Sequence, residues 1–400
     1  MLMGAVSRRL FRHRNLAHAR CIRQYRPGGL WFEARATECP RNDQGGCPVR
    51  LTLRLAGVVT LSFTTVLCVV FQLVGATSGS AAWSPGALFA LPVDIAVNGS
   101  HAWVANNYMS LKSPLANSVT EVNVSNGSLV RVISLSHIVG GLNAPNSIAA
   151  SGAHVWVTDS NRIIELNAST GSVLRVINAQ PRPHALEPAP LFAITASGTQ
   201  VWVANLNSVL EINASTGSVL RVINAKADKF SMPFGIVASR THVWVMNNVQ
   251  GDRITELNAS NGSLVRVINP QAGVFDQPAF AANGSHVWVS NYDGNSIIEL
   301  NASTGSVERV IRDRALAGLD SPDSIAASGA HLWVTSENSV VELNASTGSL
   351  VRAIKAKADG FEVMPTVYAF DTTHVWVVNT QSNSVTELNA SNGSLIHLIK

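Results

Sequence analysis

Cysteine is missing from most of the sequence, and charge is scarce in the chain as a whole. The four cysteines, Cys21, Cys39, Cys47 and Cys68, all lie in the first 68 residues, so residues 69–400 can form no disulfide. A domain of that size has a core large enough to fold without one. The spacing of the first three cysteines matches no zinc-binding pattern. Charged residues make up 14% of the chain, against roughly 25% in an average globular protein.

Recognisable catalytic signatures are also missing. The sequence contains no Gly-x-Ser-x-Gly elbow and no His-Glu-x-x-His motif, which are the patterns that place a serine nucleophile or a zinc ion. Runs long enough and periodic enough for paired helices are missing as well. Both absences favour an all-β protein with a binding role over an enzyme.

Net positive charge is confined to the N-terminal tail. Residues 1–54 hold 11 Arg, no Lys and 3 acidic residues, a net charge of +8, so the overall +4 leaves −4 for residues 55–400. The larger part of the chain therefore lacks the basic character of a nucleic-acid-binding domain. We expect residues 1–54 to be a disordered tail or an upstream extension caused by a misassigned translation start.

An uncharged segment follows the tail. Residues 55–76 carry no charge, and 22 residues are enough to span a bilayer core. Arg50 and Arg54 precede the segment, so the positive-inside rule keeps the N-terminus in the cytoplasm and exports the rest of the chain. Two alternatives remain, an uncleaved signal anchor and a cleaved signal peptide. Residues 77–91 are then a linker.

A repeat unit with one tryptophan per copy fills residues 92–400. Successive tryptophans are 53, 46, 42, 44, 45 and 43 residues apart, a period typical of propeller blades. The seven tryptophans are Trp103, Trp156, Trp202, Trp244, Trp288, Trp333 and Trp376.

The copy at residues 145–177 divides into four short strands. We expect strand A at 147–150, strand B at 154–158, strand C at 163–167 and strand D at 172–177, joined by turns that contain Gly152 and Gly171. Strands joined in this way form an antiparallel meander. Seven such meanders predict one domain, a monomeric seven-bladed β-propeller of four-stranded antiparallel blades.

Three residue types recur at fixed places in the copies. A His precedes strand B in six copies, with Gln200 in the third, and we predict that these side chains hydrogen-bond turn backbone rather than bind metal. Strand C always carries a Glu, and ten residues later strand D carries an Arg, or His397 in the last copy. We expect each Glu and Arg to pair across the two strands. Asn-x-Ser occurs twelve times, mostly in C–D turns, where Asn favours the turn whether or not it is glycosylated.

The copies differ most in their D–A and B–C loops, which leave a meander on the same face. We therefore predict that this face, the variable loop face, binds a protein, a peptide or a cell-wall component. The polar candidates on it close strand B or open strand A, positions where strand-end capping is the alternative role. They are Asp94, Asn106, Asn146, Asp159, Asn205, Asn247, Asn291, Asp323 and Asn379.

The repeat resembles the YVTN, or YncE-like, β-propeller repeat. Residues 201–205 read VWVAN, as in that family, and residues 383–399 follow the rest of its pattern, with Asn389 and Ser394 as departures. The resemblance covers residues 92–400 and implies an exported propeller, with no catalytic motif to carry over. The competing hypothesis is a metal-dependent lyase or lactonase-type propeller enzyme. It would require a divalent cation and a general base, with His137 and His184 as further loop candidates. A quinone-cofactor dehydrogenase is disfavoured, because the Trp lies in strand B and not at the end of strand D.

Overall fold

The computed structural model describes the chain in segments. They are residues 21–24, 31–35, 52–53, 87–107, 115, 117–135, 138, 145–159, 162–179, 191–206, 208–224, 230, 232–247, 253–270, 279–312, 319–336, 339–355, 367–370 and 373–400. The chain divides into two units, residues 1–80 and 81–400, and each is described by itself.

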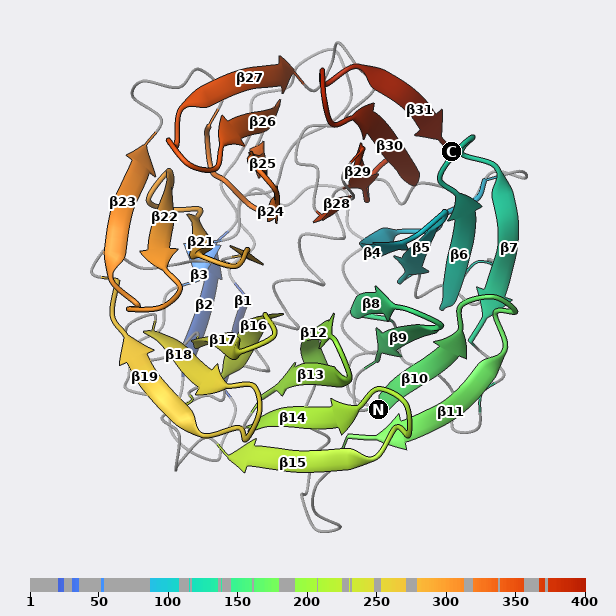
Figure 1. Cartoon of the computed structure of the whole chain (residues 1–400), viewed down its shortest axis with the longest axis horizontal. Helices are drawn as coiled ribbons and strands as arrows, with labels where there is room; N and C mark the ends of the chain where they lie inside the picture. The colour runs from blue at the N-terminus through green and yellow to red at the C-terminus, as the bar shows by residue number, and fades with distance from the viewer. Residues whose placement is uncertain are drawn as a thin grey trace. The chain divides into compact units, whose positions relative to one another are not determined.

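Residues 81–400 form seven four-stranded antiparallel blades arranged in a ring (Figure 1). In every blade the strands lie in chain order, from strand A on the inside of the ring to strand D on the outside. The A strands are β4 (Pro92–Asn98), β8 (Ser147–Ser151), β12 (Leu191–Ser197), β16 (Pro233–Ala238), β20 (Phe280–Ala282), β24 (Ile325–Ser328) and β28 (Val367–Phe370). The B strands are β5 (His101–Asn106), β9 (His154–Thr158), β13 (Gln200–Asn205), β17 (His242–Asn247), β21 (His286–Asn291), β25 (His331–Ser336) and β29 (His374–Asn379).

The two outer strands complete each blade. The C strands are β6 (Ser118–Asn123), β10 (Arg162–Asn167), β14 (Ser208–Asn213), β18 (Arg253–Asn258), β22 (Ser296–Asn301), β26 (Ser339–Asn344) and β30 (Ser384–Asn389). The D strands are β7 (Leu129–Ser134), β11 (Val173–Asn178), β15 (Val219–Asn224), β19 (Leu264–Ile268), β23 (Val307–Arg312), β27 (Leu350–Lys355) and β31 (Leu395–Ile399). The predicted fold class is confirmed, and the four strands of blade 2 begin and end within one residue of their predicted bounds.

The C–D turn is held by its asparagine. In blade 2, Oδ1 of Asn167 accepts hydrogen bonds from the backbone N–H groups of Ser169 and Thr170, both at 2.9 Å, and from the Ser169 hydroxyl at 2.7 Å. Gly171 then takes a positive φ of 70°, which suits glycine because it has no Cβ. The predicted turn role of these asparagines is confirmed, and their glycosylation stays untested.

Every blade has a register shift between strands C and D, directly after the strand-C Glu. In blade 2, Glu165 pairs with Arg175 while Leu166 pairs with Val173, so Leu174 is an extra residue on strand D. Such a bulge can re-aim a side chain. The extra residues of the seven blades are Val130, Leu174, Leu220, Val265, Glu308, Val351 and Ile396.

The seven tryptophans anchor the core between blades. Trp156 packs in one cluster with residues of blade 3, including Ile194 and Val203, and the other tryptophans likewise pack on the blade that follows. Each tryptophan is 0–2% exposed. Burying a large apolar side chain contributes about 2–3 kcal/mol, so these clusters explain how consecutive blades hold together.

The ring closes by contacts between blades 7 and 1, without a shared strand. Blade 7 is complete within its own sequence, as expected. Residues 87–91 add no strand. Instead, Phe89 is buried in a cluster with Ile95 and Trp376, and the Leu91 N–H donates to Oδ1 of Asn383 at 2.7 Å. Residues 87–91 therefore pack against blades 7 and 1, where the ring closes.

The N-terminal unit contains three short antiparallel strands in the order β1-β2-β3, namely β1 (Cys21–Gln24), β2 (Trp31–Arg35) and β3 (Thr52–Leu53). The rest of the tail and the segment at 55–76 lie outside the described residues. Among the described residues, no helix is long and apolar enough to span a bilayer. The tail, the signal or anchor segment and the linker therefore stay predictions.

Candidate functional site

The residues that close strand B are buried and bonded within their own blades. In blades 1, 4 and 7, Nδ2 of the closing Asn donates to a strand-C Thr hydroxyl at 2.9–3.0 Å. Asp159 accepts from the backbone and side chain of Arg162 at 2.8 and 2.9 Å, Asn205 accepts from Ser208 at 3.0 Å, and Asn291 accepts from the Gly294 N–H at 3.0 Å. All six, including Asn106, Asn247 and Asn379, are 0–2% exposed. These contacts brace the B–C hairpin, so a ligand-binding role for these residues stays a prediction.

Asp94 opens strand A of blade 1 and ties it to blade 2. Its Oδ2 accepts from the Ser147 hydroxyl at 2.6 Å and from the Ile148 N–H at 2.8 Å. Burial raises the pKa of Asp94 to about 6, although these hydrogen bonds act in the opposite direction. Asn146 bridges similarly, since its Nδ2 donates to the Leu191 carbonyl of blade 3 at 3.1 Å.

Asp323 is the one predicted candidate whose side chain has no hydrogen-bond or ion-pair partner among the described residues. Its backbone N–H donates to the Thr335 carbonyl at 3.0 Å, and its carbonyl accepts from the Ser290 hydroxyl at 3.2 Å. Burial raises the pKa of its carboxyl group to about 6. A partly buried carboxylate without a partner is a stronger ligand candidate than the capped asparagines.

Two aromatic side chains near the start of strand A were not predicted as site residues. Phe192 of blade 3 and Phe234 of blade 4 lie with their ring centroids 6.2 Å apart, at an interplanar angle of 48°. Each sits at a register shift between strands A and B. Their signal in the sequence is an aromatic residue at matching places in consecutive copies. His137 and His184 lie outside the described residues.

In every blade the strand-C Glu is buried and lies beside the Arg or His of strand D, and these side chains together are called the ionic row. All seven glutamates are 0% exposed. In blades 1, 2, 4, 5 and 6, Nε of the strand-D Arg lies 2.6–2.9 Å from Oε2 of the Glu. Arg221 pairs with Glu211 in blade 3, and His397 lies 2.6 Å from Glu387 in blade 7. The predicted cross-strand pair is confirmed, and its carboxylate is structural.

The same arginines also reach the next blade. Nη2 of Arg131 donates to the Ser169 carbonyl of blade 2 at 2.9 Å, and the arginines of blades 2–6 make the equivalent bond at 2.7–3.3 Å. The turn glycine leaves room for the arginine, because a Cβ on Gly171 would lie 2.8 Å from Cδ of Arg131. The row therefore joins the blades as well as the strands.

The repeated histidines have a different partner from the one predicted. In blades 1, 2 and 6 the His Nδ1 lies 2.5–2.7 Å from Oε1 of the strand-C Glu, and Gln200 donates to Glu211 at 2.6 Å in blade 3. In blades 4, 5 and 7, Nδ1 instead contacts a turn hydroxyl at 2.8–2.9 Å, and Nε2 faces the Glu at 3.5–3.6 Å. The predicted turn-backbone partner is wrong: the partners are the Glu carboxylate and a turn hydroxyl, because the pleat puts His, Trp and Glu on one face.

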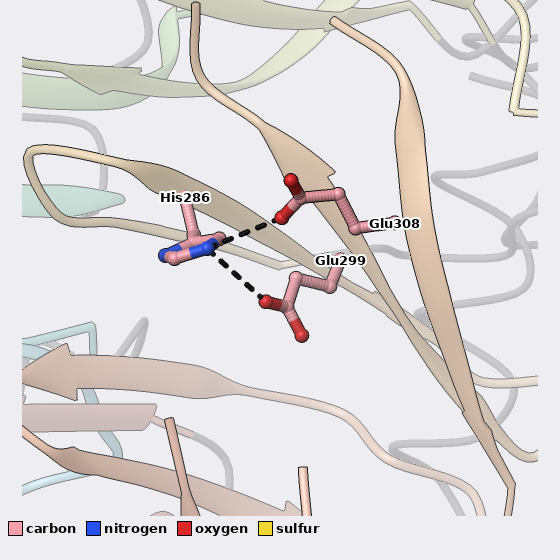
Figure 2. A group of neighbouring side chains, drawn as sticks. All are labelled: His286, Glu299 and Glu308. Carbon is pink, nitrogen blue, oxygen red and sulfur yellow. Dashed lines mark ion pairs between the residues drawn. The ribbon is translucent and has the colours of Figure 1, made fainter. Parts of the chain in front are cut away.

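Blade 5 differs from the other six by a second carboxylate. Glu308, the extra residue of its bulge, lies with Oε2 3.1 Å from Nε2 of His286, and Oε1 of Glu299 lies 3.5 Å from the same nitrogen (Figure 2). One ligand atom from each residue falls within 4.8 Å of the others. Burial raises the pKa of Glu299, and the Glu308 charge adds to that rise, while Arg309 and His286 oppose it. Glu308 was not predicted as a site residue.

Comparison with known proteins supports a β-propeller repeat. Residues 184–354, fewer than half of the 400 and spanning blades 3–6, match the family model described as outer membrane protein assembly factor BamB. The structure is similar to that of Kuenenia stuttgartiensis hydrazine synthase, with a TM-score of 0.59 at 15% sequence identity, over 78% of this chain and 98% of that chain. At this identity the likeness concerns the fold alone. No curated protein matches the sequence.

Proposed function

We propose that this chain is an exported or membrane-tethered propeller of the YVTN type that serves as a binding module for a protein partner. This role requires no cofactor. The predicted binding role of the variable loop face stays untested, and in this proposal the partner is an extended apolar segment of another protein, held at the outer strands of the ring. This choice rests on where the propeller leaves apolar side chains in contact with water.

The outermost strands carry every exposed large hydrophobic side chain found among the described residues. These side chains are Leu129, Val130, Val132, Val173, Leu174, Val176, Val219, Leu220, Val265, Val307, Val310, Val351, Leu395 and Leu398, each 36–48% exposed. They occur on the D strands of all seven blades. Exposed apolar surface that gathers on one kind of element is typical of an interaction site.

A D strand also offers unpaired backbone. Among the described residues, each D strand pairs with strand C along one side only, so its other side is a sheet edge to which an extended segment can add. An extended segment that pairs there would gain main-chain hydrogen bonds and would cover the aliphatic side chains. Strand addition therefore uses both features of the outer strands at once.

The family match adds weaker support. The matching model describes an outer membrane protein assembly factor, and a role in assembly involves protein partners outside the cytoplasm. An export route through residues 55–76 fits that location. Sequencing the N-terminus of the mature protein tests it, since a start at Thr77 or Trp83 excludes a membrane anchor.

Photo-crosslinking in the source cells tests the binding site. A photoreactive residue replaces Leu220 on an outer strand, Asp293 on the variable loop face, or Asn126 in a turn on the opposite face, all three of which are exposed. We expect a single defined protein adduct at Leu220 and none at Asn126. Adducts at Asp293 alone would move the partner to the variable loop face, and equal adducts at Leu220 and Asn126 would contradict a specific site.

A metal-dependent lyase or lactonase-type enzyme is the second candidate. It is favoured by Asp94 and Asp323, whose pKa values are both raised to about 6 by burial at the start of strand A, because perturbed carboxyl groups are frequent in active sites. This enzyme would need a divalent cation near the ring axis. Loss of bound metal in Asp323→Ala, with metal binding retained in Glu308→Val, would support it.

A further inference from the structure

We propose that blade 5 binds a divalent transition-metal ion through Nε2 of His286, Oε1 of Glu299 and Oε2 of Glu308 (Figure 2). The site lies between strands β21, β22 and β23. It is independent of the outer-strand partner and of Asp323.

The distances between the ligand atoms fit such an ion. Zn²⁺ holds nitrogen and carboxylate oxygen ligands at about 2.0–2.2 Å, so two ligands at a tetrahedral angle lie about 3.3–3.6 Å apart. Nε2 of His286 lies 3.1 Å from Oε2 of Glu308 and 3.5 Å from Oε1 of Glu299. The three ligand atoms lie within 4.8 Å of one another, so rotation of the glutamate side chains toward His286 can bring them to one ion.

The bulge on strand D supplies the third ligand. At this position the other six blades have Val, Leu or Ile, so the extra residue is an aliphatic side chain. Glu308 alone replaces it with a carboxylate, and that carboxylate turns toward His286 and Glu299 (Figure 2). A departure from the repeat at one bulge thus converts a structural row into a three-ligand cluster.

Each ligand is already oriented by a second residue. The Ser285 hydroxyl lies 2.8 Å from Nδ1 of His286, which leaves Nε2 toward the carboxylates. Nδ2 of Asn301 donates to Oε1 of Glu308 at 2.8 Å, and Nε of Arg309 lies 2.9 Å from Oε2 of Glu299. Supporting contacts of this kind fix the tautomer and the direction of metal ligands.

The burial of the three side chains and the types of their ligand atoms indicate which ion the site binds. Glu299 is fully buried, and its carboxylate faces the side chains of Trp288 and His286. His286 and Glu308 are 26% and 32% exposed, which leaves an open side for water as a fourth ligand. One imidazole and two carboxylates favour Zn²⁺ or a similar transition metal over Ca²⁺ or Mg²⁺, which prefer oxygen ligands alone.

Blade 4 provides the matched control. His242 has the same orientation, with Nδ1 2.9 Å from the Thr241 hydroxyl and Nε2 3.6 Å from Glu256. Asn258 corresponds to Asn301, and the bulge residue is Val265. Blade 4 therefore has every element of the site except the third ligand.

Equilibrium dialysis of the detergent-solubilised full chain against Zn²⁺ tests the site. We expect wild type to bind one equivalent more than Glu308→Val, so that Zn²⁺ bound elsewhere cancels in the difference. Val265→Glu should bind one equivalent more than wild type, and the two changes together should restore the wild-type value. Ser285→Ala should weaken the site about tenfold.

Folding is checked by thermal unfolding without metal, and Glu308→Gln replaces Glu308→Val if the latter does not fold. Equal Zn²⁺ binding by wild type and the folded Glu308 variant overturns the site. No gain in folded Val265→Glu overturns the assignment of the bulge residue as the third ligand.

Discussion

The middle strands of each blade, B and C, differ in their side chains from its inner margin, the start of strand A, and from its outer margin, strand D. On strands B and C, the seven copies agree: each has a buried Trp and a buried Glu that pairs with an Arg or His of strand D. Strand D carries exposed aliphatic side chains in every copy, and its bulge residue departs from an aliphatic only at Glu308. The start of strand A differs between copies, and there lie Asp323, which has no side-chain partner among the described residues, and the Phe192–Phe234 pair. The buried side chains of the middle strands therefore build the ring, and the side chains at the margins, which contact water, are available for binding.

The two regions also differ in how much a substitution lowers the stability of the fold. A buried group in the middle strands loses packing or leaves a charge uncompensated when it is changed. A side chain at the margin is partly in water already, so its replacement costs the fold little. The following variants separate the two regions.

Trp244→Ala should have the largest effect on stability. Trp244 is 1% exposed and packs against Val287 and Val289 of blade 5. The cavity and the lost burial together should lower the free energy of unfolding by about 3–5 kcal/mol. Chemical denaturation measures it, and a loss below about 1 kcal/mol would contradict the role of the tryptophans in joining blades.

Arg352→Ala should cost less, about 2–3 kcal/mol. It leaves the buried Glu342 with His331 alone and removes the bond to the Ser391 carbonyl of blade 7. Breaking a buried pair costs about 3–5 kcal/mol, and the partial exposure of Arg352 reduces this. Arg352→Lys is the control, since it keeps the charge without the two-sided contact. No change in the unfolding midpoint with Arg352→Ala would show that the row does not join blades.

Asp94→Asn should change how stability depends on pH. The folded pKa of about 6 lies above the ordinary 3.8, so the folded chain binds more protons than the unfolded chain between about pH 4 and 6. Stability then falls as pH rises through this window. The shift corresponds to at most about 3 kcal/mol, and partial solvent contact reduces it to about 1–2 kcal/mol.

Asparagine keeps an acceptor for Ser147 and Ile148, so the variant should be more stable than wild type at pH 7.5 and should lose part of the slope. Unfolding midpoints at pH 4.5, 6 and 7.5 measure this. Asp323→Asn should remove a further part, because its pKa is raised similarly. An unchanged slope in both variants would contradict the raised pKa values.

Leu174→Thr should have the smallest effect, within about 0.5 kcal/mol. Leu174 is 42% exposed on strand D of blade 2, whereas Leu166 on strand C of the same blade is 1% exposed. Leu166→Thr is therefore the matched control and should cost about 2–4 kcal/mol. Equal losses in the two variants would remove the distinction between margin and interior.

The sequence predicts the ring well because its signals are local. The Trp period, the turn glycines and the Glu–Arg spacing each fix a hairpin or a blade, and the structure confirms all of them. The partners of the buried residues that close strand B differ between blades, from a strand-C Thr or Ser to Arg162 and the Gly294 N–H, and periodicity does not reveal them. Glu308 was missed for a related reason: a bulge shifts the register of strand D, so which side chain turns back toward strand B is visible only in three dimensions.

The central claim is that binding and folding reside in different parts of each blade. The most direct test measures adduct yield at position 220 beside the free energy of unfolding in Val219→Glu, on the same outer strand, and Ile212→Ala, on strand C of the same blade; Val219 is 40% exposed and Ile212 is 0% exposed. Val219→Glu should lower the yield severalfold and change stability by less than about 1 kcal/mol. Ile212→Ala should cost about 2–5 kcal/mol and leave the yield intact while the chain is folded. Yield and stability that fall together in both variants would contradict the claim.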